Sequence, residues 1–228
     1  MRPAICERVC CGRISLGGAD RRQRLSGISS VLLSGHIMEL RVATMEDVPA
    51  LNALIADSAR GLSAEHYTAL QIEALITHVF GVDTQLIADG TYYVIVADET
   101  NLPVAAGGWS ERRTLYGGDQ AKAGEDSRLN PATDAARIRA FFVHPFFARR
   151  GLARQLYDQC ERAARLAEFR KFELMSTLPG EPLYAALGFD AVERLSVRLA
   201  GDVDVPLVRM QRRIDSRPLE HHQVAPVG

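Results

Sequence analysis

Residues 137–154 constrain the fold more than any other part of the chain, because a strand pattern passes directly into a helix pattern there. The apolar run 136–143 predicts the strand, and Pro145 ends it because proline has no N–H to donate to a neighbouring strand. Gly151 then opens a helix to about Ala167 whose apolar residues fall on one face. We therefore expect the start of this helix to be held firmly against a sheet.

The start of that helix has the composition of an anion-binding site. The first N–H groups of a helix have no partner within it, and the helix dipole places about half a positive charge there. Gly151 and Ala153 let a ligand approach the backbone, and Arg149, Arg150 and Arg154 add positive charge. The segment lacks the Gly-Lys-Ser/Thr ending of a P-loop and the glycine triplet of a Rossmann turn. It predicts a site for a phosphate or pyrophosphate group.

The pattern from Met38 onward predicts a mixed sheet flanked by helices. Alternation and β-branched or aromatic runs indicate strands, and apolar residues at helical spacing indicate helices. The polar, aperiodic residues 114–134 predict a long loop. The element order implies an α/β domain of the α+β kind, with a mostly antiparallel, twisted sheet of about six to seven strands and one right-handed β-α-β unit. The predicted strands are 39–43, 92–97, 104–113, 136–143, 171–176, 191–199 and 205–212, and the predicted helices begin near residues 44, 63, 151 and 181.

Both ends of the chain differ from this pattern. Residues 1–37 carry six arginines against two acidic residues. They could form a transit peptide, but helical amphipathicity is poor; they could bind nucleic acid, but no aromatic residue is available to stack on bases. We favour a disordered extension, or residues upstream of a natural start at Met38. The predicted division is therefore an extension over 1–37, a domain over 38–214 and a flexible tail over 215–228.

Composition excludes several classes of protein. Hydrophobic residues make up 47% and charged residues 24%, which is typical of soluble globular proteins. A net charge of -1 provides no general attraction to nucleic acid or anionic lipid, and no apolar run is long enough to span a bilayer. Four cysteines without zinc-ligand spacing suit a reducing compartment. We expect a cytoplasmic protein that binds no metal, nucleic acid or membrane.

Two motifs resemble those of the GNAT superfamily of acetyl-CoA-dependent N-acetyltransferases. Residues 148–153, Ala-Arg-Arg-Gly-Leu-Ala, are similar to the Q/R-x-x-G-x-G/A signature between strand four and helix three of that family, with Ala148 in place of Gln or Arg. Residues 182–189, Pro-Leu-Tyr-Ala-Ala-Leu-Gly-Phe, resemble the late motif, a short helix with a tyrosine followed by Gly-Phe. The element order from 38 to 212 also agrees, so the resemblance covers the whole domain.

The resemblance implies the GNAT acyl-CoA N-acyltransferase fold, with acetyl-CoA as acyl donor. In this family strand four splays from strand five at a bulge, and pantetheine pairs with main-chain groups exposed there. We accordingly expect backbone bonds from Phe142 and Val143 to pantetheine, and a pyrophosphate held by the amides of Arg149, Arg150, Gly151, Leu152, Ala153 and Arg154. The implied reaction transfers acetyl to a primary amine of a small molecule or protein, by direct attack in a ternary complex.

The catalytic side chains follow less directly. Tyr184 is the candidate general acid, because a phenol with a pKa near 10 can donate a proton to the leaving thiolate; a simply packed tyrosine is the alternative. Glu111 could be the base or a solvated ion-pair partner of Arg112 or Arg113, and Trp109 could line the acceptor pocket or belong to the core.

Three further expectations remain open. A polar group of Ser176 or Thr177 could face the cofactor, and His144 belongs to the turn that ends its strand. Because the base is uncertain, a non-catalytic acyl-CoA sensor on the same fold is the alternative to an enzyme. The last two strands could pair between subunits and form a homodimer.

Overall fold

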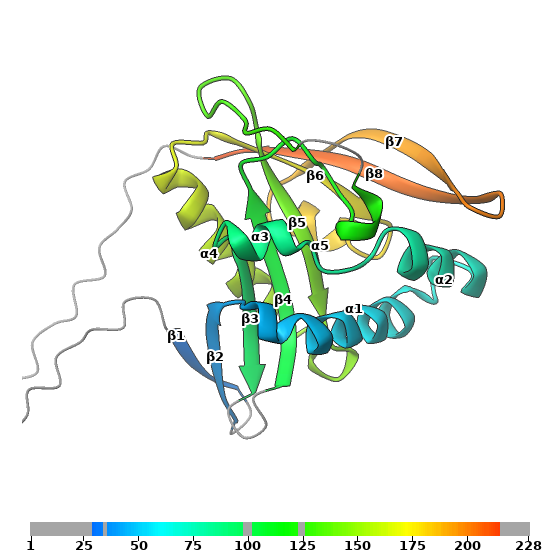
Figure 1. Cartoon of the computed structure of the whole chain (residues 1–228), viewed down its shortest axis with the longest axis horizontal. Coiled ribbons are helices and arrows are strands. Elements are labelled where there is room, and N and C mark those ends of the chain that lie inside the picture. The colour runs from blue at the N-terminus through cyan, green and yellow to red at the C-terminus, as the bar shows by residue number, and fades with distance from the viewer. Residues whose placement is uncertain (1–28, 34–35, 98–101, 123–125, 215–228) are drawn as a thin grey trace, which may run out of the picture.

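The computed structural model describes residues 29–33, 36–97, 102–122 and 126–214, with side chains from residue 38 onward. Within these residues one sheet of eight strands has the order β1-β2-β3-β4-β5-β6-β8-β7 (Figure 1). The strands are β1 (Ser29–Leu33), β2 (His36–Val42), β3 (Tyr92–Ala97), β4 (Leu102–Ser110), β5 (Ala136–Val143), β6 (Lys171–Thr177), β7 (Asp190–Leu199) and β8 (Val203–Arg213). The helices are α1 (Val48–Ser63), α2 (Ala69–His78), α3 (Thr84–Ala88), α4 (Leu152–Leu166) and α5 (Glu181–Ala186), with 3-10 turns η1 (Met45–Asp47), η2 (Asp119–Ala121) and η3 (Pro145–Phe147).

The sheet is mixed and mostly antiparallel, as the sequence predicts. Only β5 and β6 pair in parallel, and α4 connects them; every other neighbouring pair in the described sheet is antiparallel. A parallel pair needs such a crossover because the chain must return to the same end of the sheet. The β5-α4-β6 unit therefore lies at the centre of the domain, as expected from residues 137–154.

Two elements were not predicted. Strand β1 pairs with β2 in antiparallel register, Ser29 opposite Leu40, although the sequence predicts no structure for residues 1–37. The run Ser-Ser-Val-Leu-Leu is short and does not alternate, so its strand conformation depends on the edge that β2 offers. Helix α3 is only five residues long and falls below the length at which periodicity is informative. The predictions for residues 1–28 and 215–228 lie outside the described residues.

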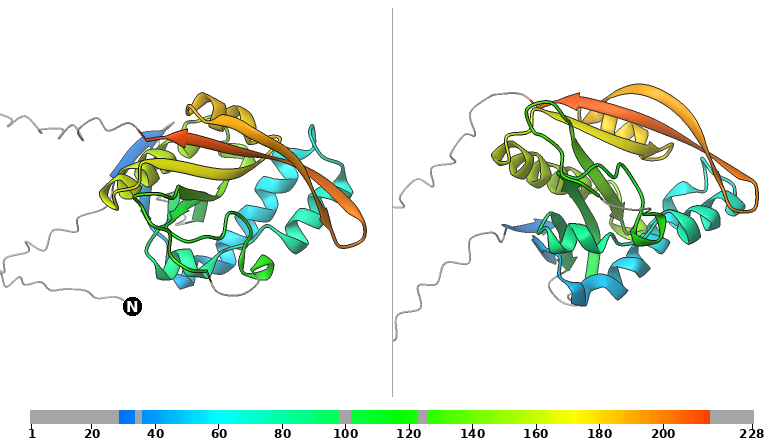
Figure 2. Two further views of the ribbon diagram at one scale, coloured as in Figure 1. Left: turned by 90° about the horizontal axis from the view of Figure 1, so that it is seen from above. Right: turned by 45° about the horizontal axis from the view of Figure 1, so that its top comes forward.

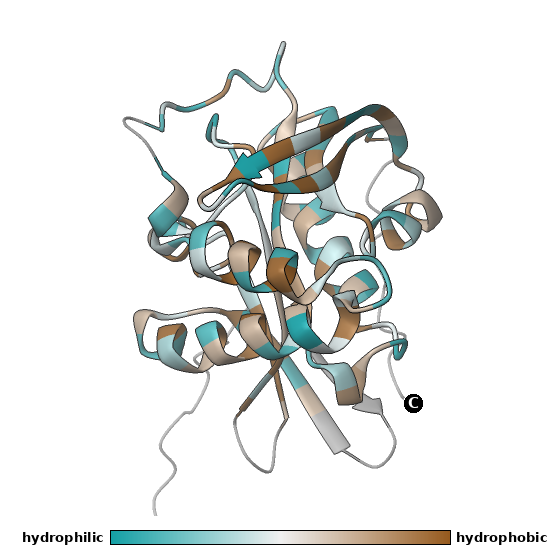
Figure 3. Cartoon of the chain, turned by 90° about the vertical axis from the view of Figure 1, so that its right-hand side faces the viewer, coloured by the Kyte–Doolittle hydropathy of each residue, from teal (hydrophilic) through white to brown (hydrophobic). Residues whose placement is uncertain are grey.

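Helices cover both faces of the sheet. On one face α4 buries the stripe that the sequence predicts, and Leu156, Tyr157 and Cys160 are each at most 1% exposed. On the other face α1 packs Leu51 and Ile55 against β3 and β4, with α2 and α3 beside it. Figure 3 shows hydrophobic and hydrophilic residues alternating along the helices and the β7–β8 hairpin, as expected for elements with one buried side.

The β7–β8 hairpin projects beyond the sheet alongside α2 (Figure 2). Two hydrogen bonds to main-chain carbonyls attach it there. The Tyr67 hydroxyl donates to Pro206 O at 2.7 Å, and the Gln71 amide donates to Asp204 O at 2.7 Å. The Tyr67 oxygen also accepts from the Leu178 N–H at 2.9 Å, so this side chain, two residues before α2, joins β8 and the segment after β6.

A bulge re-aims β5 in the middle of the sheet. Gly108 pairs with Arg139 and Ala106 with Phe142, so Ala140 and Phe141 face the single residue between them on β4. Ala140 has a φ of 52°, the left-handed region that L residues seldom adopt. The residue opposite is Gly107, where a Cβ would lie 2.6 Å from the Phe141 ring. Glycine at this position leaves room for the bulged side chain.

Strand β5 separates from β6 even before this bulge. The parallel pairing is limited to Ala136 with Phe172 and Arg137 with Glu173. The remaining length of β5 therefore has β4 on one side and no strand on the other. This gap in the sheet defines where a ligand can enter between two strands.

A buried ion pair holds the long loop against the same region. The Arg139 guanidinium lies 2.9 Å from Asp83, and both side chains are 1% exposed. Arg139 also donates to the carbonyls of Thr114 at 2.8 Å and Gly117 at 2.6 Å, and Lys122 is a second cation on Asp83. Residues 114–122 are thereby fastened to β5 and to the start of α3.

We predict that Asp83→Asn lowers the free energy of unfolding by about 3 kcal/mol, because it leaves the Arg139 charge buried without its nearest counter-charge. Asparagine can still accept the hydrogen bond that the Gln85 N–H donates to Asp83, so the substitution removes the negative charge and keeps the helix cap. Urea denaturation measures the difference. The exposed Asp57→Asn should stay within about 0.5 kcal/mol of the wild type. A similarly small change for Asp83→Asn would contradict the role given to the pair.

Candidate active site

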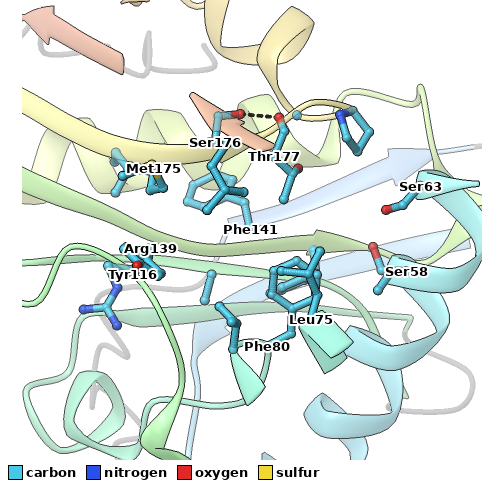
Figure 4. Close-up of a pocket in the computed structure, with 18 of the residues that line it drawn as sticks. Ser58, Ser63, Leu75, Phe80, Tyr116, Arg139, Phe141, Met175, Ser176 and Thr177 are labelled. Carbon is cyan, nitrogen blue, oxygen red and sulfur yellow. Dashed lines mark hydrogen bonds between the residues drawn. The ribbon is translucent and has the colours of Figure 1, made fainter. Parts of the chain in front are cut away.

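A pocket of about 230 Å³ opens where β5 and β6 separate (Figure 4). Its walls come from α1, α2, the loop around residues 115–118, the bulged part of β5, the end of β6 and α5. These segments lie far apart in the sequence. The splayed strands bring them together, and the predicted anion-binding turn adjoins the pocket through Ala153.

Strand β5 contributes both residues that were expected to bond pantetheine. Phe142 and Val143 line the pocket. The His144 N–H donates to Val104 O on β4 at 2.9 Å, whereas the preceding Val143 N–H donates to the Ser58 hydroxyl at 3.2 Å on the other side. Since N–H and C=O of one strand residue point the same way, the Val143 carbonyl faces the gap. Its N–H is already bonded within the protein, which differs from the expectation for that atom.

Ser58 is a site residue that the sequence reasoning missed. It lies on α1 and is 6% exposed, among the apolar positions that include Leu51, Leu54 and Ile55. A hydroxyl within an apolar helix stripe needs a partner, because a buried polar group without one is costly. That pattern was the available signal. Figure 4 shows Ser58 and Ser63 at the same end of the pocket, both from α1.

The start of α4 is open to a ligand. Gly151 is the N-cap with a φ of 84°, and no side chain caps the helix. The Ala148 N–H donates to Pro145 O and the Gln155 N–H donates to Gly151 O. Between these two, the N–H groups of residues 149–154 find no acceptor in the described part of the chain. A Cβ at Gly151 would meet no atom within 4 Å, so the space in front of these amides is free.

Three arginines surround those amides in different ways. The Arg150 guanidinium lies over the rings of Phe146 and Phe147, 5.4 Å and 5.5 Å from their centroids. Arg154 donates to Ala186 O at 3.4 Å, at the end of α5, and Arg149 is exposed. All three keep positive charge beside the helix start. Leu152, in contrast, is 1% exposed in the core, so it can offer a ligand only its backbone.

Sequence comparison decides the family. The model of the acetyltransferase (GNAT) family matches residues 58–189, more than half of the chain. The chain belongs to the GNAT acetyltransferase family. The matched range contains the bulged strand β5, the open start of α4 and the short helix α5.

Solved structures show the same GNAT fold at low sequence identity. A GCN5-related N-acetyltransferase from Rhodopseudomonas palustris is 19% identical with a TM-score of 0.55, over 76% of this chain and 94% of that one. PaiA N-acetyltransferase from Thermoplasma acidophilum, solved in complex with coenzyme A, is 13% identical with a TM-score of 0.51, over 77% and 98%. A GNAT acetyltransferase from Listeria monocytogenes is 17% identical with a TM-score of 0.53, over 81% and 99%. A comparison with curated proteins finds no match.

Within this GNAT fold, α5 places Tyr184 in the pocket wall. The side chain also packs, with ring centroids 6.3 Å from Phe141 and 5.7 Å from Phe189. Tyr184 therefore lines the pocket and also packs in the core, the two alternatives that the sequence left open. Burial raises the pKa of Tyr184 above its usual 10. The phenol keeps its proton at neutral pH.

The structure does not bring Glu111 and Trp109 to the pocket of the GNAT domain. Trp109 is 5% exposed and packs edge-on against Phe169, 6.0 Å between centroids, in the core beside α4. Glu111 lies beyond the end of β4 and pairs with Arg128, not with Arg112 or Arg113. Trp109 therefore has the core position that the sequence left open, and Glu111 is an ion-pair partner, of Arg128. Alternation along β4 directs Trp109 to the face that α4 covers, and β4 ends at Ser110, earlier than predicted.

The remaining predicted polar residues either line the pocket or cap a turn. Ser176 and Thr177 line the pocket from the end of β6, and the Ser176 hydroxyl donates to Thr177 O at 2.8 Å. His144 caps η3 by accepting the Phe146 N–H at 3.2 Å, which is the turn role expected of it. In the described residues no group of three or more His, Cys, Asp or Glu could hold a metal ion. None of the described helices combines the length and apolar character that crossing a bilayer requires.

Proposed function

We propose that this GNAT protein transfers acetyl from acetyl-CoA to a primary amine of a small molecule or protein, by direct attack in a ternary complex. The observation that carries the proposal is the row of unpaired amides at residues 149–154, which opens beside the pocket formed by the splayed strands. The fold is also that of the Thermoplasma acidophilum enzyme solved with coenzyme A.

Coenzyme A fits this arrangement in one direction. Its pyrophosphate accepts hydrogen bonds from the amides at the start of α4, where the helix dipole and Arg149 favour negative charge. Its pantetheine arm enters the gap, which Phe142 and Val143 line, and meets the Val143 carbonyl. The main chain of Phe142 pairs with Ala106 on β4, so only the Phe142 side chain borders the arm. The thioester then lies near Tyr184, on the opposite wall.

The chemistry needs one proton donor and one route for a proton to leave. The amine nitrogen attacks the thioester carbon, the C–S bond breaks, and the thiolate takes a proton from Tyr184. Burial raises the pKa of Tyr184, so the phenol is in its protonated form, the form that can donate. The proton on the amine leaves to water, since no carboxylate or imidazole is found among the described residues that line the pocket, and water returns a proton to the Tyr184 oxygen.

The lack of a carboxylate or imidazole among the described pocket residues also favours a second candidate function, a sensor that binds acyl-CoA without turnover. The two candidates differ in one measurement. The enzyme releases free thiol steadily when acetyl-CoA and a panel of primary amines are supplied. The sensor binds coenzyme A tightly and releases none, and Tyr184→Phe leaves its behaviour unchanged.

Location and assembly stay predictions. Cys160, the cysteine within the described residues, is a buried free thiol, which is compatible with the expected cytoplasmic compartment. The expected homodimer would use β7, an edge strand of the described sheet with a largely exposed face.

We predict that Gly151→Glu weakens coenzyme A binding about 100-fold, because it places a carboxylate against the pyrophosphate and like charges in contact cost several kcal/mol. Calorimetric titration with coenzyme A measures the affinity. Gly151→Ala introduces the same backbone strain at a φ of 84° without the charge. Gly201→Glu introduces the same charge at a φ of 78° in the β7–β8 turn, where a Cβ also meets nothing within 4 Å.

Both control variants should bind coenzyme A within about threefold of the wild type, since neither places charge at the start of α4. Unchanged affinity in Gly151→Glu would remove the basis for placing the pyrophosphate there. Equal losses in Gly151→Glu and Gly201→Glu would point to a general effect of charge.

We predict that Tyr184→Phe lowers kcat about 100-fold and leaves the coenzyme A affinity unchanged, as expected for loss of a general acid. Tyr93→Phe, which removes a buried phenol outside the pocket, should leave kcat unchanged. Thiol release measures both. The Tyr184 phenol loses its proton only when the pH rises through its pKa, and burial raises that pKa above 10. The wild-type rate should therefore show no decrease caused by ionisation of Tyr184 between pH 7 and 10. Full activity of Tyr184→Phe would remove the proposed acid.

A further inference from the structure

The pocket has two ends of different character (Figure 4). Ser58 and Ser63 lie at one end, where the Ser58 hydroxyl accepts the Val143 N–H at the last residue of β5, from which the chain leads to the start of α4. Tyr116, Arg139 and Met175 lie at the other end. Under the proposed function the first end admits pantetheine, so the second end receives the acceptor. Any assignment of an acceptor to the second end therefore rests on that proposed function.

The acceptor end is lined by apolar and aromatic side chains from α2, the residues after it, the long loop, β6 and β8. Phe80 packs edge-on against Phe142, with ring centroids 5.3 Å apart, so an aromatic wall continues from β5. Sulfur and ring edges favour contact with a further aromatic ring. The apolar and aromatic residues that these segments contribute to the pocket are Leu75, Val79, Phe80, Tyr116, Met175 and Leu207.

The charged side chain at this end, Arg139, offers little to a ligand. The Arg139 guanidinium donates to Asp83, Thr114 O and Gly117 O, so its charge is compensated and its N–H groups point into the protein. Asp83 itself has two cations, Arg139 and Lys122. Among the described residues that line this end, no uncompensated carboxylate is therefore available to recognise a second ammonium group.

The next carboxylate along β6 is compensated in the same way. Glu173 is 8% exposed and lies two residues before Met175, on the same face of the strand. Arg137 and Arg209 both pair with it, Arg209 at 2.9 Å. Arg209 also pairs with Glu193 at 3.0 Å. Because Asp83 and Glu173 are each fully paired with cations of the protein, neither offers a free negative charge to an acceptor that carries several positive charges.

The loop closes this end of the pocket. The Gly118 N–H donates to Val79 O at 2.8 Å, and the Gln120 side chain donates to Phe80 O at 2.6 Å. Asp119 accepts the Thr84 N–H at 3.1 Å. Tyr116 and its neighbours are thus held against α2 and α3, which leaves space for a compact group and not for an extended peptide.

We propose that the acceptor is a compact primary monoamine with an apolar, aromatic body. The same apolar lining supplies a reason why the pocket needs no basic side chain. Transfer of an ammonium group into apolar surroundings lowers its pKa, because burial penalises the charged form. The amine therefore loses its proton on entry and presents its lone pair to the thioester. A polyamine would retain further charges that this end cannot compensate.

Thiol release from acetyl-CoA by the full-length chain tests the class of acceptor. The probes are 2-phenylethylamine, spermidine and a short peptide with one lysine. We expect kcat/KM for 2-phenylethylamine to exceed that for spermidine and for the peptide at least about tenfold, the discrimination that an apolar pocket achieves. A higher kcat/KM for spermidine or for the peptide would overturn the proposal.

A pair of variants tests the location. Tyr116→Asp adds a carboxylate at the acceptor end, and Leu70→Asp adds one on α2 at a side chain that is 67% exposed and outside the pocket. Tyr116→Asp should lower the ratio of kcat/KM for 2-phenylethylamine to that for spermidine at least about tenfold, with unchanged coenzyme A affinity. Leu70→Asp should leave the ratio unchanged. Equal ratios in both variants and the wild type would overturn the assignment of this end.

A binding measurement separates failure of this proposal from failure of the proposed function. If no amine is acetylated, the enzyme proposal fails. Calorimetric titration of 2-phenylethylamine into the complex with coenzyme A then decides the acceptor end alone. Binding that Tyr116→Asp weakens and Leu70→Asp does not would support the apolar amine site, whereas absence of binding to the wild type would overturn it.

Discussion

The separation of β5 from β6 after two residue pairs is the constraint on which the rest of the structure depends. A bulge on β5 follows the separation, and Gly107 opposite it leaves room for the Phe141 ring. Once the strands part, one side of β5 has main-chain groups without a strand partner, and α4 begins at the end of the same gap. A slot for an extended ligand arm and an anion site for its charged end thereby become continuous.

Charged side chains around this gap are paired, whereas the amides at its end are not. Arg139, Asp83 and Glu173 are buried and each has a partner of opposite charge, as burial of charge demands. The amides of residues 149–154 have no acceptor in the described part of the chain. Under the proposed function these N–H groups bind the pyrophosphate. The proposed acceptor end has the opposite character, because its apolar lining would lower the pKa of an entering amine instead of supplying a base.

The sequence predicts the central unit well and the catalytic residues poorly, for physical reasons. The stripe of α4 and the turn at Gly151 are local features, since both depend on residues a few positions apart. Trp109 and Glu111 were assigned from their place near the end of a strand, but which face a strand residue occupies depends on its register with neighbouring strands. Ser58 lies 85 positions before its partner Val143, a contact that no local pattern contains.

The sequence by itself determined the family and the strand order around α4, and it predicts the anion site, because each depends on backbone geometry that short motifs specify. Only the tertiary structure decided which side chains share the pocket. That outcome depends on the bulge in β5, on the buried pairing of Arg139 with Asp83 that brings Tyr116 to the acceptor end, and on the packing of α1 that brings Ser58 to β5. These are contacts between distant segments, and their energies come from burial in one shared core.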